Sequence, residues 1–238
     1  MNLNNDYYEN TDINFKNALE FYQTDYTHSE LIELLKNGNI PQKQIAALKL
    51  DSVKSEYDAK VLLSNLTGQD GKIREAVSLR LNEFMSDSDC ILYFDAENNC
   101  SVFLDAITDI NANICRNVIS ALTNLKNNEN FCNIFCRELV QLTFNLLDIV
   151  EKFDFQEGKY KVNKEAFKLY WCLETIYVFW DKMNFEDLKN IIKRSKSIGE
   201  YTIREKAAKI LTHDFVDDEL IVVRNELKND SNYYVRRF

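Results

Sequence analysis

Apolar residues along this chain recur every three to four positions, the spacing of one face of an α-helix. Short polar turns separate the apolar stretches, which predicts consecutive helices joined in pairs. The predicted pairs are residues 30–36 with 41–50, 56–66 with 72–85, 101–109 with 111–125, 130–152 with 164–183, and 185–196 with 201–212. A further pair begins at 217–227, and a helix at 13–22 precedes them all.

Turn-forming residues support these boundaries. Ser29 is a candidate N-cap for the helix at 30–36, Gly38 follows its end, and Pro41 lies where the first turn of the next helix tolerates proline. The polar, acidic segment 86–99 interrupts the alternation of helices. We expect this segment to be irregular.

Composition supports an all-α fold. The 238 residues include 5 glycines and 1 proline, too few for the tight turns of a sheet-rich protein of this length. We expect a polar segment with a capping helix at residues 1–28 and a single array of helix pairs at 29–238.

A short phrase recurs at the start of the second helix of several pairs. Residues 73–81 read IREAVSLRL, and residues 203–211 read IREKAAKIL. Residues 230–236 read DSNYYVR, and 109–122 follow the same pattern with Cys115 in the place of the arginine. The first pair departs from the pattern, because Gln42 and Lys43 replace the isoleucine–arginine pair. Repetition of this kind is typical of stacked helical repeats.

These phrases resemble HEAT repeats over about residues 29–238. The resemblance implies a right-handed α–α superhelix, here of about five to six helix pairs, and a role as a scaffold or adaptor. It also implies a ladder of carboxylates and guanidiniums between repeats, which the acidic residue before each arginine suggests independently. The candidate ladder residues are Asp70, Arg74, Arg204 and Arg236.

Charge is distributed unevenly along the chain, whose net charge is −9. Residues 1–157 carry 13 basic and 25 acidic residues, whereas residues 158–238 carry 16 and 13. This balance is atypical of a duplex-binding protein, and it suits either solubility or contact with a basic protein.

The chain carries no recognisable catalytic or cofactor signature, and we expect it not to be an enzyme. Its six cysteines lie mostly within apolar helical stretches, and we expect reduced, mostly buried thiols and no metal site. Cys132 and Cys136 are spaced to share a helix face, but no histidine lies near them in sequence. The acidic beginning and the absence of a long apolar stretch predict a cytoplasmic protein without membrane spans.

Two groups of residues are candidates for partner binding. On the aromatic helix 164–183, periodicity assigns Tyr170 and Tyr177 to the core and displaces Trp171 from it, so Lys168, Trp171 and Glu174 become a candidate partner surface. At the end of the chain, Tyr233 and Tyr234 are candidates for contact with a partner or a second copy.

One basic stretch is a candidate anion site. It includes Lys193, Arg194, Lys196 and Lys206, for which the alternative is a solvated face. Alkylpurine DNA glycosylases are also HEAT-like and combine aromatic and acidic residues in a basic groove, but no catalytic aspartate can be matched here.

The sequence therefore favours a non-enzymatic protein–protein interaction module without a cofactor. One version is an inhibitor or immunity-type protein that masks a basic partner, and a HEAT-like alkylpurine DNA glycosylase is the catalytic alternative. Nucleic acid is not the expected partner.

Overall fold

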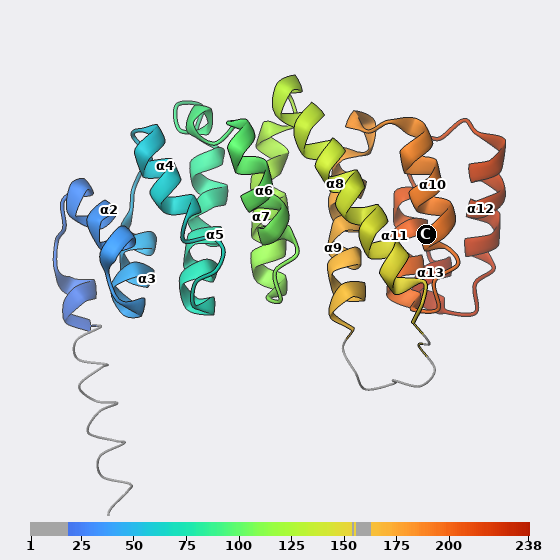
Figure 1. The fold of residues 1–238 in the computed structure, drawn as a ribbon, viewed down its shortest axis with the longest axis horizontal. Coiled ribbons are helices and arrows are strands. Elements are labelled where there is room, and N and C mark those ends of the chain that lie inside the picture. Colours follow the sequence, from blue (N-terminus) through green and yellow to red (C-terminus); the bar gives the residue numbers. More distant parts are fainter. Residues whose placement is uncertain (1–18, 154, 156–162) are drawn as a thin grey trace, which may run out of the picture. The chain divides into compact units, whose positions relative to one another are not determined.

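The computed structural model describes residues 19–153, 155 and 163–238, and these residues form helices with no β-strand among them (Figure 1). Residues 19–23 are helical, and most of the predicted helix 13–22 lies outside the described residues. The chain divides into two compact units, Met1–Phe94 and Asp95–Phe238. The boundary falls inside the segment that we expected to be irregular, and a single array over 29–238 stays a prediction.

In the first unit, two helix pairs follow one another. They are α2 (His28–Asn37) with α3 (Ile40–Lys49) and α4 (Glu56–Leu63) with α5 (Gly71–Met85), and the short 3-10 helix η1 (Ile91–Tyr93) follows. Helix α2 packs against α3 and α4, and α3 packs against α5. First helices thus contact first helices and second helices contact second helices, as in stacked pairs.

Local sequence sets the helix starts in this unit. Thr27, rather than the predicted Ser29, is the N-cap of α2, and it forms a capping box with Glu30. Asn39 caps α3 in the same way with Gln42, and Pro41 lies in the first turn.

In the second unit, helices pack in two layers of the same kind. The elements are η2 (Glu97–Asn99), α6 (Cys100–Ile107), α7 (Ala112–Leu122), η3 (Thr123–Leu125), α8 (Glu129–Val150), α9 (Lys164–Phe179), η4 (Trp180–Lys182), α10 (Phe185–Ser195), α11 (Tyr201–Ile210), α12 (Asp218–Lys228) and α13 (Tyr233–Arg236). Helices α6, α8, α10 and α12 contact in succession, and so do α9, α11 and α13. Every predicted pair is therefore present among the described residues, with boundaries shifted by a few residues.

A line of phenylalanines joins α6, α8 and α9 inside the second unit. Ring centroids are 6.0 Å apart between Phe103 and Phe131, and 5.4 Å apart both between Phe131 and Phe135 and between Phe135 and Phe179. All four rings are buried, so they contribute apolar contact between these helices. None of the described helices combines the length and the apolar character that a membrane span requires.

Small residues and leucines take the packing positions expected from the repeated phrase. Ala76 and Leu81 on α5, and Ala207 with Leu211 in and after α11, are all buried. The alanines allow close helix approach and the leucines fill the space one turn later.

Candidate functional site

A recurring turn precedes four of the second helices, in both units. The side chain of its N-cap residue accepts a hydrogen bond from the backbone N–H two residues later. The caps are Asp70, Asn111, Glu200 and Asn232, with donor–acceptor distances of 2.9, 2.9, 3.2 and 2.9 Å. The phrase found in the sequence therefore encodes a specific cap.

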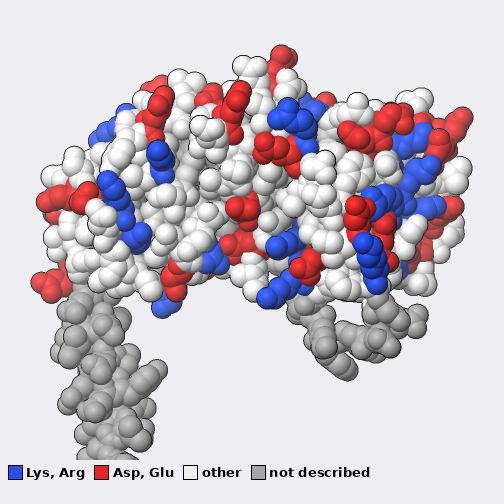
Figure 2. Space-filling view, in the orientation of Figure 1, with Lys and Arg blue, Asp and Glu red and all other residues white. Residues whose placement is uncertain are grey.

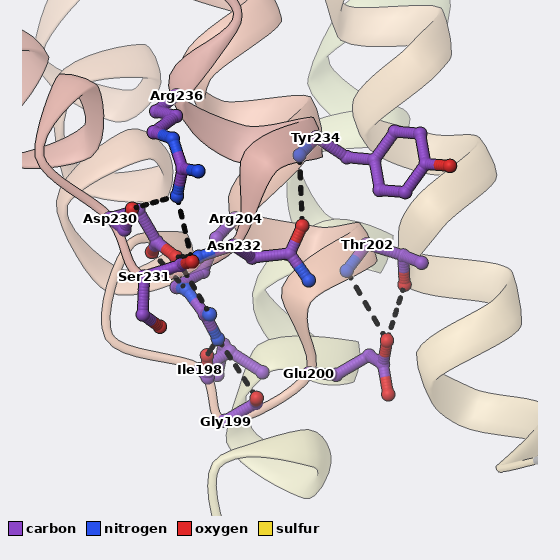
Figure 3. A network of polar contacts seen from close by, with 10 residues as sticks. All are labelled: Ile198, Gly199, Glu200, Thr202, Arg204, Asp230, Ser231, Asn232, Tyr234 and Arg236. Carbon is purple, nitrogen blue, oxygen red and sulfur yellow. Dashed lines mark hydrogen bonds and ion pairs between the residues drawn. The ribbon is translucent and has the colours of Figure 1, made fainter.

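The arginine four residues after the cap folds back onto the turn. Arg204 Nη1 donates to the carbonyl oxygens of Ile198 and Gly199 at 2.9 and 2.8 Å. Arg236 Nη1 donates to those of Asp230 and Ser231 at 3.1 and 2.8 Å (Figure 3). The guanidinium thus donates hydrogen bonds to backbone carbonyls that precede the helix and take no part in its own backbone hydrogen bonds.

The same geometry is present in the two earlier turns. Arg74 Nη1 donates to the carbonyl oxygen of Gln69, five residues back, as in the later turns. Cys115, which stands in the place of the arginine, donates from Sγ to the carbonyl oxygen of Asp109 at 3.1 Å. A buried thiol therefore takes over one of the hydrogen bonds of the arginine.

Arg204 also joins two consecutive helix pairs. Its Nε lies 2.7 Å from Asp230 Oδ2, and its Nη2 lies 3.2 Å from Oδ1. Figure 3 shows this fork between the start of α11 and the turn before α13. Hydrogen bonding by Arg204 lowers the pKa of Asp230. Asp70, the other acidic residue of the candidate ladder, is the N-cap of α5 in the first unit. In the second unit, the contact between consecutive helix pairs is formed by Arg204 and Asp230, the aspartate of the following turn.

A polar seam runs between α9 and α11. Glu174 accepts hydrogen bonds from Lys206 and Lys209 at 2.6 and 2.7 Å. The two ammonium groups lie over the rings of Tyr170 and Tyr177, each 4.2 Å from the centroid. Since these residues recur every three to four positions on both helices, the seam is a continuous line of cation–π and ion-pair contacts.

The seam keeps its charges under burial. Lys206 is 7% exposed; burial disfavours its charge, but hydrogen bonds to Glu174 and Tyr170 outweigh burial and raise its pKa. Burial likewise favours the protonated form of Glu174, yet the two lysines outweigh it and lower the pKa of that carboxyl. A lysine with a raised pKa stays protonated near neutral pH and is a poor nucleophile or base.

The predicted partner surface on α9 is not arranged as expected. Trp171 is 5% exposed, packs against the rings of Phe167 and Tyr170, and faces the core rather than solvent. Tyr170 and Tyr177, which periodicity assigned to the core, are half-buried. Lys168 is exposed, whereas Glu174 belongs to the seam. The helix was correctly identified, but the prediction of which of its aromatic side chains are buried was wrong for Trp171.

The four residues of the candidate anion site are paired with carboxylates. Figure 2 shows basic and acidic side chains interspersed over the part of the second unit around α10 and α12. The pairs are Lys193 with Glu219, Arg194 with Asp148 and Glu151, Lys196 with Glu226, and Lys206 with Glu174. This stretch therefore presents ion pairs rather than free cations. The partners lie 26 to 46 residues away in sequence, which is why spacing gave no sign of them.

Three exposed tyrosines and two arginines meet at α11 and α13. Tyr201, Tyr233 and Tyr234 are 38%, 63% and 51% exposed. Centroid distances are 6.2 Å from Tyr201 to Tyr234 and 5.7 Å from Tyr233 to Tyr234. Arg236 lies over the ring of Tyr233, and Arg237 over that of Tyr234. We call these five residues the tyrosine–arginine patch.

The helix α13 that carries the patch is packed against the rest of the unit. Val235 is fully buried between the exposed tyrosines and arginines, and Arg237 pairs with Glu205 of α11 at 2.7 Å. Residues 230–236 are held in place, because Asp230 is fixed by Arg204 and α13 packs on α11 and α12.

The cysteines are buried, as expected. All six are free thiols. Cys132 donates to the carbonyl oxygens of Leu125 and Lys126. Among the described residues, no three His, Cys, Asp or Glu side chains are placed to share a metal ion.

No family model matches the chain, and no curated protein matches it significantly. A solved structure of an engineered protein aligns with 90% of this chain and 93% of its own, with a TM-score of 0.46 and 15% sequence identity.

Proposed function

We propose that this chain is a non-enzymatic protein-binding module, built of HEAT-like helix pairs in a right-handed superhelix, that holds a protein partner through the tyrosine–arginine patch. The exposure of Tyr201, Tyr233 and Tyr234 beside two arginines is the observation that carries the proposal. Tyrosine and arginine are enriched among residues that dominate binding energy in protein interfaces.

The rigidity of the patch adds to its suitability. Its residues stand on α11, on α13 and directly after α13. The two helices are fixed to each other by the Arg204–Asp230 fork and by buried Val235. Little conformational entropy is then lost when a partner docks, so more of the contact energy appears as affinity.

Two of the other functional hypotheses differ in their support. The pairing of the basic stretch with carboxylates counts against a nucleic-acid groove there, and so against the glycosylase.

The inhibitor hypothesis rests on the acidic balance of residues 1–157. It predicts nanomolar binding of one basic protein that weakens as salt rises, whereas an adaptor should show weaker or several partners.

A photo-crosslinking residue placed at Tyr233 tests the proposal. We expect a discrete crosslinked species with a protein of the source lysate, or a crosslinked dimer if the partner is a second copy. Tyr22 is the matched control, because it has the same residue type and the same 63% exposure. The Tyr234→Ala variant should reduce the crosslinked species at Tyr233. Equal labelling at Tyr22 and Tyr233 would contradict the proposal.

Truncation is a poorer test than side-chain substitution. Removing residues 230–238 would delete Asp230, the partner of Arg204, together with buried Val235. The loss of binding would then be inseparable from the loss of folding.

A further inference from the structure

A cleft of 410 Å³ lies between α8 and the start of α10, within the second unit. This volume falls in the range of ligand-binding pockets. Its walls come from one face of α8 and from residues 182–187. The cleft shares no residue with the tyrosine–arginine patch or with the α9–α11 seam.

The cleft has an apolar floor. Val140 and Phe144 of α8 and Met183, before α10, contribute to its lining. Val140 is buried, and the other two side chains are half-buried. An apolar side chain of a ligand could therefore lose its contact with water here, and methionine adapts its shape to such contacts.

Polar residues stand in one line along α8. Asn133, Arg137 and Gln141 are four residues apart and exposed, so they recur about every 6 Å along one helix face. An extended peptide repeats about every 6.6 Å on one side, because each residue rises about 3.3 Å. The two periods agree closely enough for an extended segment to meet all three side chains.

Amides suit the main chain of such a segment. An Asn or Gln side chain offers both a donor and an acceptor, and can pair with a peptide group independently of the ligand's sequence. Gln141 already donates from Nε2 to Asn145 Oδ1 at 3.1 Å, which orients the side chain.

The charges of the cleft differ from those of the surface beside it. Lys189, Lys193 and Arg194 of α10 are all paired with carboxylates. Arg137 and Lys182 line the cleft and form no ion pair with a carboxylate among the described residues. Asp187 is the one carboxylate in the lining, and it lies in the first turn of α10, where the helix dipole favours it. In a chain of net charge −9, this cleft is lined by more cations than anions.

We propose that the cleft binds an extended acidic segment of a protein partner. A carboxylate of the segment pairs with Arg137 and Lys182, its main chain pairs with Asn133 and Gln141, and an apolar side chain rests on the floor. The inference rests on the proposed protein-binding function, but it names a different surface and a ligand chemistry.

Peptide titration tests the cleft with purified full-length protein. The probe is acetyl-Gly-Leu-Glu-Leu-Glu-Gly-amide, and its reference is the same peptide with glutamine in place of both glutamates. We expect saturable NMR shifts of the side-chain amides of Asn133 and Gln141, with affinity at least tenfold higher for the acidic peptide. Affinity should fall as salt rises, because the cations are solvent-accessible.

Charge-reversal variants locate the binding. Arg137→Glu and Lys182→Glu should each weaken binding of the acidic peptide at least tenfold. Arg116→Glu is the matched control, since Arg116 is exposed on α7 and contacts Asn113 rather than the cleft. Circular dichroism and thermal melting verify that each variant is folded. Equal affinity for the two peptides, or equal loss in Arg116→Glu, would overturn the inference.

The two proposals fail separately. Peptide binding that depends on Arg137, together with no specific crosslinking at Tyr233, would support the cleft and reject the patch. Crosslinking at Tyr233 without binding of either peptide would support the patch and reject the cleft.

Discussion

Arg204 and Asp230 form a forked ion pair that joins two consecutive helix pairs of the second unit. The two nitrogen–oxygen distances are 2.7 and 3.2 Å. The side chains are only 16% and 11% exposed. The same guanidinium also binds two backbone carbonyls, so one residue fixes its own turn and the turn of the next pair.

The fork should stabilise the fold measurably. We expect Arg204→Ala to lower the free energy of unfolding by about 3 kcal/mol, because the carboxylate of Asp230 loses its main partner. A double-mutant cycle with Asp230→Ala should give a coupling energy of about 1–2 kcal/mol by chemical denaturation. Arg204→Lys should recover less than half of the loss, since lysine cannot form the fork.

Arg237 provides the control for this prediction. It also pairs with a carboxylate across α11 and α13, that of Glu205, but its side chain is 42% exposed. Exposed pairs typically contribute below about 1 kcal/mol. If Arg237→Ala and Arg204→Ala cost the same, burial of the fork would not be the source of its strength.

Glu174, the carboxylate of the α9–α11 seam, should be sensitive to substitution. Glu174→Ala leaves Lys206 and Lys209 facing each other without a counter-charge, and Lys206 is buried. We expect a loss of about 3–5 kcal/mol of unfolding free energy. The double variant Glu174→Leu with Lys206→Met should be clearly more stable than Glu174→Ala in urea denaturation. A double variant that is less stable would show that the seam tolerates no apolar replacement.

Some features of the structure were predicted from sequence patterns, and others could not be predicted from them. Periodicity and turn residues predicted α5 almost to the residue, because its stripe and its cap lie in one short segment. The same periodicity misplaced Trp171 because α9 packs against both α8 and α11, so more than one of its faces is covered. Which aromatic is inside is decided by neighbours far away in sequence.

The candidate sites illustrate the same limit. The rung from Arg204 to Asp230 was suggested by the sequence, since an acidic residue, Asp70, Glu200 or Asp230, precedes each arginine of the repeated phrase. The pairing of Lys193 with Glu219 and the cleft beside Arg137 depend on how α8, α10 and α12 stack, which no local pattern encodes. Tyr233 and Tyr234 were candidates for partner contact, and the structure shows that both are exposed and that each contacts an arginine.

Acid should destabilise the protein through the carboxylates of the polar networks. The pKa values of Asp230 and Glu174 are lowered in the folded state. Their stabilising contribution is therefore complete above the unfolded-state pKa values, near 4, and is lost as pH falls through the lower folded-state values. We expect the melting temperature to drop steeply between about pH 5 and pH 2. Glu174→Gln should flatten this drop, and an unchanged slope would contradict the assignment.

Thiol chemistry should report the integrity of the fold. Burial raises the pKa of Cys100, Cys115, Cys136 and Cys172 to about 12. At pH 8 only roughly one thiol in ten thousand at each of these sites would be ionised, and the thiolate is the reactive form. We expect a chromogenic disulfide reagent to modify these four residues only as fast as the protein opens, and to modify all six cysteines at once in denaturant.

Replacement of Arg204 by alanine should accelerate the native reaction of Cys172 only if the second unit opens as one cooperative body. Fast modification of the native protein at Cys115 would show that its hydrogen bond to Asp109 does not hold α7 closed.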